Sequence, residues 1–482
     1  MIGCHRIFLA ILLLAASSGA AKAQVDTTSN PEESAVPALP MPDSDPLTLD
    51  ATTDPIILFL QRTTTQQDFA RYIEQAIRAN AAIDEAVAGI AEASASRREA
   101  RAGLFPTIDI GLSARTSIAR NFSNDPDNIL ERSRSTGRTD ATFSVNQTVL
   151  DFGATSIRIS AASARLRAAE FEAARQADEV ALQAIAAWYD VCTYRMMVHL
   201  TEQFIERQIN LREAIQMRVR QGVSAQADIV TVDALIAISE ALTARYLREL
   251  ANAETRFTSY FDVEPPPNIV MPAVPEFRFS SRDAVHLAAA RTPAVEITRA
   301  QSRAALQDSR AARSDTLPRV TAGIEGGRFG IFENDNDYDI RGVVSLQYRL
   351  FGAADARADQ ARALARAAEA RAERVREDAV RLALIAWTDV DALEQELAAA
   401  ERGYLTARQS RDVVLTRFEN LRGSLFDVID AERRYAEATT AYIASTTELG
   451  AAHYVLLSRT GGLLSTLGIT VPNSAPTLSD GQ

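Results

Sequence analysis

The sequence of 482 residues contains little cysteine and little histidine, and each shortage excludes a class of site. Only two cysteines occur, and Cys4 falls in an N-terminal segment that we expect to be removed, so Cys192 would have no intramolecular disulfide partner. The four histidines are scattered, and no nucleophile elbow, phosphate-binding loop or metal-ligand spacing is present. We therefore expect no enzymatic activity, no cofactor and no metal. The formal net charge of −12 argues against a nucleic-acid partner.

Long hydrophobic segments are missing as well. Beyond residue 23, no stretch approaches the roughly 18 to 20 apolar residues that a transmembrane helix needs. Residues 1–23 have a basic start at Arg6, an apolar run over residues 7–16 and the cleavage motif Ala21-Lys22-Ala23, which together predict a secretory signal peptide. If the mature protein crosses a membrane, it must do so as a β-barrel.

An internal duplication is the strongest positive signal. The two tryptophans, Trp188 and Trp387, are 199 residues apart, and much of the sequence around them repeats at this offset. The matching segments are Phe152-Gly153-Ala154 with Phe351-Gly352-Ala353, Arg212 with Arg411, Arg218 with Arg417, and Asp228 with Asp427. A repeat of this length predicts two copies of one structural unit.

The composition divides the chain around these two copies. Segments rich in proline and polar residues separate them from the ends and from each other. The expected parts are a signal peptide (1–23), a flexible Pro-rich leader (24–65), a first repeat (66–262), a linker (263–280), a second repeat (281–464) and a C-terminal tail (465–482).

Each copy changes its hydrophobic period in the same order. Helical spacing over residues 66–103 and 281–316 ends before Pro106 and Pro318, because proline stops a helix. Alternation of apolar and polar residues then predicts two strands per copy, joined by polar loops at residues 121–138 and 333–337. A helix of about 67 residues, roughly 100 Å long, follows from residue 154. A returning helix begins near Asp228 or Asp427.

The strands allow two interpretations. A soluble sheet with one buried face shows this alternation, and so does a membrane barrel built from strands of about ten residues. The apolar positions of the first strand are Ile108, Ile110 and Leu112, and the polar partners include Asp109 and Ser113. Four strands cannot close a barrel, since the smallest have about eight. The membrane interpretation therefore requires an oligomer.

The long helices carry heptad patterns that differ between the copies. The second helix has a sustained apolar seam interrupted by one charge, Arg411. The first places Thr201, Gln208 and Arg212 on the matching stripe, a choice that predicts helices facing a water-filled tube. Arg212 and Arg411 would either line this tube or form ion pairs between helices.

At this point the sequence resembles the TolC family of outer-membrane channel proteins, over about residues 66–464. The elements that carry the resemblance are the proline that enters each hairpin (Leu104-Phe105-Pro106 and Leu317-Pro318), the phenylalanine and glycine that leave it (Phe152-Gly153 and Phe351-Gly352), and the tip segment 418–430. No single element would suffice, and their duplicated order is what supports the resemblance.

The resemblance implies a mainly α fold with a membrane β-barrel. Three chains would form a homotrimer in the outer membrane of a Gram-negative bacterium, each giving four strands to one 12-stranded barrel, while an internally duplicated long-helix α-barrel extends into the periplasm. Family members act as passive exit ducts of tripartite efflux pumps or type I secretion systems. Their partners are a periplasmic adaptor (membrane fusion protein) at the helix tips, an inner-membrane transporter of RND or ABC type, and outer-membrane lipid.

The resemblance also implies a site at the tips. Acidic residues of the second tip form the pore constriction in the family, and these positions match Asp427 and Asp430. Three-fold symmetry would stack two carboxylate rings there, which favour cations. The other interpretation is that an acid near a helix start favours the helix dipole, with Ser424 as the cap.

The family's closing contacts map onto this chain with departures. The tyrosine of the second tip corresponds to Phe418, which has no hydroxyl group, and the arginine corresponds to Gly423, with Arg422 one residue earlier. Asp228 matches the acid of the first tip, which leaves a clasp between Arg422 and Asp228 as the candidate gate. Gly222 ends the first long helix and lies, like Asp228, at the first tip.

The long helices also allow a second functional class. A structural periplasmic coiled-coil or surface adhesin without transport activity would explain the long helices. It leaves the two amphipathic hairpins unexplained.

Overall fold

The structure, a computed structural model, describes residues 39–42, 50–123, 126, 129, 136–275, 278–333, 337–349, 351–420 and 422–470. The predicted signal peptide, most of the leader and the tail from residue 471 lie outside these residues. The first half contains η2 (Ala51–Thr53), α1 (Pro55–Leu60), β1 (Thr63–Thr64), α2 (Gln66–Ala79), α3 (Ala81–Ala102), β2 (Thr107–Thr116), β3 (Gly137–Leu150), α5 (Ala154–Arg220) and α6 (Gln226–Phe261). The second half contains β4 (Met271–Pro272), α7 (Arg282–Ala289), α8 (Pro293–Ser314), β5 (Arg319–Phe329), β6 (Tyr338–Gln347), α9 (Ala354–Glu419), α10 (Leu425–Arg459) and α11 (Leu463–Thr466).

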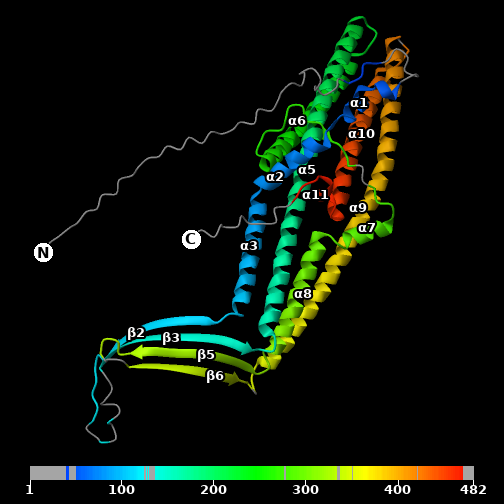
Figure 1. The fold of residues 1–482 in the computed structure, drawn as a ribbon. Coiled ribbons are helices and arrows are strands. Elements are labelled where there is room, and N and C mark those ends of the chain that lie inside the picture. Colours follow the sequence, from blue (N-terminus) through cyan, green and yellow to red (C-terminus); the bar gives the residue numbers. More distant parts are fainter. Residues whose placement is uncertain are drawn as a thin grey trace, which may run out of the picture. The chain divides into compact units, whose positions relative to one another are not determined.

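The predicted order of elements occurs twice, with one difference in each copy. The helix before each hairpin is broken, between α2 and α3 and between α7 and α8 (Figure 1). Asn80 ends α2 in an extended conformation, and its side chain caps α3 by accepting a hydrogen bond of 3.0 Å from the backbone N–H of Ala82. In the second copy Pro293 starts α8, where its fixed φ favours a new helix.

The segment that we expected to be a flexible leader is folded in its second half. Asp50–Thr65 contains η2, α1 and β1, and Ile56, Ile57 and Leu60 are buried. β1 pairs in parallel with β4, which lies in the predicted linker, so these two short segments hold each other. The expectation of flexibility was therefore wrong for this part, because its apolar residues and Asp54 find partners on helices far away in the sequence.

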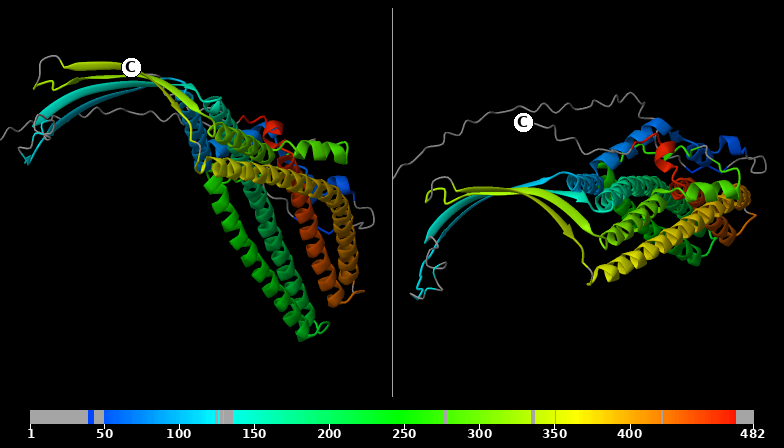
Figure 2. Two further views of the ribbon diagram at one scale, coloured as in Figure 1. Left: turned by 90° about the horizontal axis from the view of Figure 1, so that it is seen from below. Right: turned by 60° about the horizontal axis from the view of Figure 1, so that its bottom comes forward.

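α5 is the central helix of the described fold. It packs against α3 and α8 over the part next to the sheet, and against α6 and α10 over the other part, while α9 packs against α8 and α10 (Figures 1 and 2). The two long helices are α5, with 67 residues, and α9, with 66 residues, as the hydrophobic pattern predicted.

The two tryptophans occupy equivalent places in this packing. Trp188 of α5 contacts the rings of Phe69, Phe257 and Phe261, and its indole N–H donates a hydrogen bond of 2.9 Å to the carbonyl of Val270. It thus joins α2 and α6 to α5. Trp387 of α9 packs against two clusters of buried hydrophobic residues, one that includes residues of α7 and one that includes a residue of α10. In each repeat, a large aromatic ring fixes the helix break and the returning helix.

Two of the three polar residues of the stripe on α5 are buried, which corrects the expectation that they face water. Thr201 and Gln208 are only 6% and 9% exposed within a single chain. The Thr201 hydroxyl donates to the backbone carbonyl of Met197 at 2.9 Å, so it needs no water. Arg212 forms an ion pair with Asp233 of α6, in agreement with the paired alternative.

The strands form one antiparallel sheet in the order β2-β3-β5-β6. The register places Ile110, Phe143, Gly326 and Ile340 side by side on one face, and Gly111, Thr142, Gly327 and Asp339 on the other. The apolar face is unpacked in the single chain: Ile110, Ile340 and Val344 are 85%, 62% and 77% exposed. None of the described helices is long and apolar enough to span a membrane.

Candidate functional site

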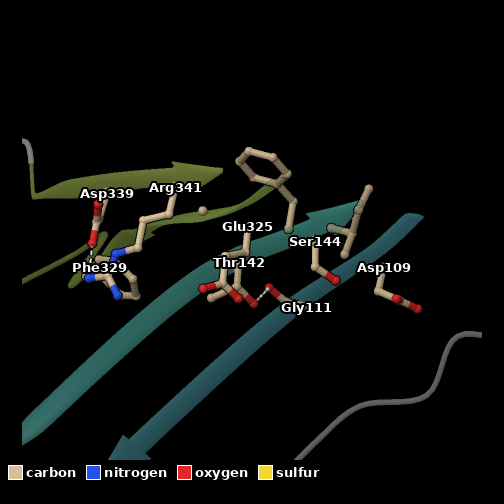
Figure 3. Close-up of a pocket in the computed structure, with 11 residues that line it drawn as sticks. Asp109, Gly111, Thr142, Ser144, Glu325, Phe329, Asp339 and Arg341 are labelled. Carbon is tan, nitrogen blue, oxygen red and sulfur yellow. Dashed lines mark hydrogen bonds and ion pairs between the residues drawn. The ribbon is translucent and has the colours of Figure 1, made fainter. Parts of the chain in front are cut away.

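The polar face of the sheet is hollowed into an open pocket of about 490 Å³ (Figure 3). Charged side chains from three strands line it, namely Asp109 of β2, Glu325 of β5, and Asp339 and Arg341 of β6. Arg341 forms an ion pair with Asp339. One face of this sheet can therefore contact hydrocarbon while the other contacts water.

Two glycines of β5 let neighbouring strands approach closely on these faces. A Cβ atom on Gly326 would lie 2.8 Å from the carbonyl oxygen of Asp339, and one on Gly327 would lie 2.7 Å from that of Ala141. Real side chains do not tolerate such distances, so the glycines permit the bent path that the strands follow (Figure 2).

The sheet is open at both sides in the described chain. β2 pairs only with β3, and β6 pairs only with β5, among the strands that the structure describes. Long unpaired edge strands are unfavourable for a secreted protein, because they attract other chains. Within the described part of the chain, both edges are therefore free to pair with another strand.

The first helical tip is built by glycine. Gly222 has φ of +77°, and its N–H bonds the carbonyl of Val219 at 3.0 Å, while the N–H of Val223 bonds the carbonyl of Arg218 at 2.9 Å. These two bonds form a Schellman motif, which satisfies the last carbonyls of α5. Asp228 then caps α6, because its carboxylate accepts the N–H of Ala225 at 3.1 Å.

The second tip has a reciprocal cap at the start of α10. The hydroxyl of Ser424 accepts the N–H of Asp427 at 3.2 Å, and the carboxylate of Asp427 accepts the N–H of Ser424 at 3.3 Å. This capping box shows that Asp427 has a structural role, as the second interpretation predicted. Asp427 remains exposed in this role.

Asp430 is surrounded by arginines. Arg433 and Arg434 each form an ion pair of 2.8 Å with its carboxylate, and Arg433 also pairs with Glu437 at 2.7 Å. The hydrogen bond from Arg433 lowers the pKa of Asp430, so the carboxylate stays ionised. The negative charge of Asp430 is therefore largely balanced within one chain.

The two tips of one chain are joined by an unexpected contact. The guanidinium group of Arg218, at the end of α5, lies 4.0 Å from the ring centre of Phe418 at the end of α9. The same group donates a hydrogen bond of 3.0 Å to the carbonyl of Phe418. Beside it, Leu425 and Ile429 of the second tip pack on the buried cluster formed by Ile215, Ile229 and Val232 of the first.

Comparison with known proteins agrees with this geometry. Residues 72–261 match the family model of the outer membrane efflux proteins. The matched segment covers most of the first repeat, so the likeness to that family rests on this part of the chain. A comparison with curated proteins gave no match.

Solved structures extend the likeness to both repeats. The outer-membrane channel OprN has 19% identity and a TM-score of 0.73, and the match covers 84% of this chain and 93% of that chain. The outer membrane protein VceC from Vibrio cholerae has 18% identity and a TM-score of 0.70, covering 82% and 96%. The CmeC outer membrane channel from Campylobacter jejuni has 13% identity and a TM-score of 0.72, covering 89% and 95%. The expected fold, long helices with a small sheet as in outer-membrane channels, is confirmed.

The residues that we expected at the tips do lie at the tips, but the expected clasp is not formed within one chain. Among the described residues, Arg422 has no ion pair with Asp228. A Cβ atom on Gly423 would lie 3.4 Å from the backbone nitrogen of Phe418, an ordinary van der Waals distance, so the turn at the end of α9 would accommodate a small side chain.

Two sets of polar residues were not predicted from the sequence. Arg218 was seen only as part of the repeat, and its contact with Phe418 had no sequence signal because the two residues are 200 positions apart. Asp54, with its partners Tyr404 and Arg408, was missed because the leader was expected to be flexible. An acid directly before Pro55 at a helix start was the one available signal.

Proposed function

We propose that three copies of this chain form a passive exit duct in the outer membrane of a Gram-negative bacterium, with the helical part in the periplasm. The observation that carries the proposal is the sheet, whose exposed face is apolar, whose opposite face is polar, and whose two edges are open. Joining β6 of one copy to β2 of the next removes every edge, and three copies give a 12-stranded barrel.

The duct would work in a tripartite efflux pump or a type I secretion system. The tips offer exposed apolar side chains to a periplasmic adaptor, including Val223 at the first tip and Phe426 at the second, which are 64% and 75% exposed. The adaptor would couple the duct to an inner-membrane transporter of RND or ABC type. Co-purification with the full-length channel, compared with a Phe426→Ser variant, tests this docking surface.

The narrowest part of the duct would lie at the second tip. Asp427 is the carboxylate that we expect to act on passing ions, because it is exposed at the turn and no arginine pairs with it in the described chain. Asp430 carries two arginines, so its ring would add less charge to the pore. A ring of three Asp427 carboxylates would favour cations and bind multivalent ones.

Closure of the duct would use the contact between Arg218 and Phe418 in place of the expected clasp. A guanidinium over an aromatic ring contributes roughly 0.5 to 2 kcal/mol, depending on its exposure. Together with the apolar cluster around Ile215, it would hold α9 and α10 against α5 and α6 at the tips.

Single-channel conductance of the purified trimer in planar bilayers tests the duct and its constriction. We expect a cation-selective pore in the wild type, and we expect Asp427→Asn to weaken selectivity and multivalent-cation block more than Asp430→Asn does. Glu448→Gln serves as the matched control, because Glu448 lies on α10 about 32 Å from Asp427 and about 27 Å from Asp430 along the helix axis.

Three results would change the proposal. If neither aspartate substitution changes the selectivity or the multivalent-cation block of the pore, the proposed duct stands and the assigned constriction is wrong. Equal effects of Asp427→Asn and Glu448→Gln would show that the selectivity comes from the general charge of the lumen. Folded trimers that never conduct would refute the duct itself.

A further inference from the structure

An N-terminal segment is bound by both repeats at once. We call Leu39–Pro42 together with Asp50–Leu60 the N-terminal strap. Arg207 of α5, in the first repeat, donates hydrogen bonds of 2.8 Å to the carbonyl oxygens of Leu39 and Pro40. Arg411 of α9, in the second repeat, donates to the same Pro40 carbonyl at 3.3 Å. One carbonyl oxygen of the strap therefore links guanidinium groups of the two repeats.

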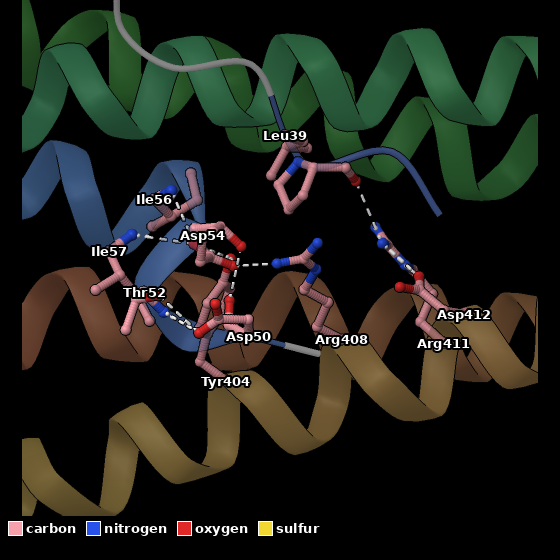
Figure 4. Close-up of polar contacts among 12 residues, drawn as sticks. Leu39, Asp50, Thr52, Asp54, Ile56, Ile57, Tyr404, Arg408, Arg411 and Asp412 are labelled. Carbon is pink, nitrogen blue, oxygen red and sulfur yellow. Dashed lines mark hydrogen bonds and ion pairs between the residues drawn. The ribbon is translucent and has the colours of Figure 1, made fainter. Parts of the chain in front are cut away.

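A second anchor of the strap is Asp54, whose side chain is 0% exposed (Figure 4). Its carboxylate accepts the backbone N–H groups of Ile56 and Ile57 at 2.8 and 3.0 Å and so caps α1. The same carboxylate accepts the hydroxyl of Tyr404 at 2.8 and 3.0 Å and forms an ion pair with Arg408. Asp54 thus starts the helix of the strap and fastens it to α9 with the same two oxygens.

The ion pairs around the strap lie deep in the helical packing. Arg411 and Asp412 are both 0% exposed and pair with each other, and the Arg411 guanidinium also lies 4.2 Å from the ring centre of Tyr435 on α10. Arg408 is 8% exposed. Buried charges of this kind are strongly destabilised when one partner is removed, because the remaining charge cannot be solvated.

The position of the strap matters for the tips. By the rise of an α-helix, Arg207 lies about 22 Å before Gly222 on α5, and Arg411 lies about 18 Å before Gly423 at the other tip. Because α5 and α9 are continuous helices from these anchors to the tips, a rigid-body movement that parts the tips also parts the helices at the anchors and lengthens the bonds to the strap. The two tips of one chain are packed together, and we take their opening to be a movement of this kind.

We propose that the N-terminal strap is a latch, which ties α5 of the first repeat to α9 of the second and opposes opening of the helical tips. The latch is separate from the contact between Arg218 and Phe418 and lies outside the duct's constriction. The inference rests on the proposed duct function, because it concerns the opening of that duct.

The test compares three variants of the full-length trimer in planar bilayers. Asp54→Asn removes the charge that holds Arg408, and we expect the open fraction at fixed voltage to rise about tenfold or more. Tyr404→Phe removes only the hydroxyl bonds and keeps the ring, which stacks on Tyr442 at 5.5 Å, so a smaller rise is expected. Asp50→Asn is the matched control, because Asp50 is an exposed acid of the same strap that bonds only to Thr52 and to its own helix start.

The outcomes separate the latch from the duct. Wild-type trimers that do not conduct refute the proposed function. If wild-type trimers conduct, and folded Asp54→Asn and Tyr404→Phe trimers have the open fraction of Asp50→Asn, the latch is wrong and the strap only adds stability. If Asp54→Asn does not form trimers, Tyr404→Phe and Arg408→Gln decide by the same comparison. A graded rise in open fraction, largest where the charge is lost, supports the latch.

Discussion

An arginine placed on the apolar face of the sheet should prevent stable insertion, whereas one on the polar face should not. We choose Ile110→Arg, because Ile110 is 85% exposed in the single chain and lies near the middle of β2. The ten residues of β2 span about 34 Å, or about 24 Å along the membrane normal at a tilt of 45°, which matches an apolar band of about 25 Å. Ile110 is therefore placed close to the bilayer midplane.

The expected magnitude follows from this depth. Arginine on the lipid face at the midplane costs about 2 to 4 kcal/mol per chain, and three copies raise this to about 6 to 12 kcal/mol per trimer. Thr142→Arg is the matched control, since Thr142 lies opposite Gly111, one residue further along β2, and lines the polar pocket near Glu325. Water and a nearby carboxylate would accommodate this arginine at little cost.

The assay is the yield of heat-modifiable trimer in outer-membrane fractions, followed by the urea midpoint of trimers that form. We expect little trimer from Ile110→Arg and a near-normal yield and midpoint from Thr142→Arg. Equal yields for the two variants, or a larger loss in Thr142→Arg, would show that the assigned faces are wrong and would refute the membrane role of the sheet.

Three further predictions concern the helical part. Burial raises the pKa of Asp178 to about 6 from 3.8, and a hydrogen bond from Ser458 only partly offsets this effect. The folded state then binds the proton more tightly than the unfolded state does. The free energy of unfolding should therefore rise by up to about 3 kcal/mol as the pH falls from 7 to 4. Urea titrations at a series of pH values should show this rise in the wild type and not in Asp178→Asn. Gly450→Ala should lower the thermal midpoint, because its Cβ would lie 2.6 Å from the hydroxyl of Tyr189 and the overpacking costs about 1 to 3 kcal/mol. Adding Tyr189→Phe to the same chain should restore part of the lost stability. If the double variant is no more stable, the predicted clash is wrong. Gly222→Ala should cost about 1 to 2 kcal/mol through backbone strain alone, as its φ is +77° and no atom lies within 4 Å of the added Cβ; an unchanged urea midpoint would contradict this.

Much of the fold follows from periodicity that can be read along the chain. The prolines at positions 106 and 318, the alternation around Ile110 and the uninterrupted helical spacing after Gly153 are local signals. They predicted the hairpins and the helices of 67 and 66 residues. The helix break at Asn80 was missed, because the spacing of apolar residues continues across it and only the side-chain cap on Ala82 shows the new start.

The site was predictable in position and only partly in chemistry. The duplicated offset placed Asp228 and Asp427 at equivalent tips, and the structure finds both in helix caps. The partners of Asp430 follow from helical spacing, since Arg433 and Arg434 are three and four residues further on. No rule of helical spacing predicts the contact of Arg218 with Phe418, because this contact depends on how two tips that are distant in sequence pack together.

The sequence by itself determined the duplication, the type of each long element and the two-sided character of the strands, because these depend on the period of apolar residues along a single segment. Only the tertiary structure decided which charged side chains are buried and which segments of the chain they bind. Asp54 and Tyr404 form a hydrogen bond although they are 350 positions apart in the sequence, and Pro40 and Arg411 form one at a separation of 371 positions. A buried ion pair is selected by the packing of whole helices around it, and no local pattern records which segments that packing brings into contact.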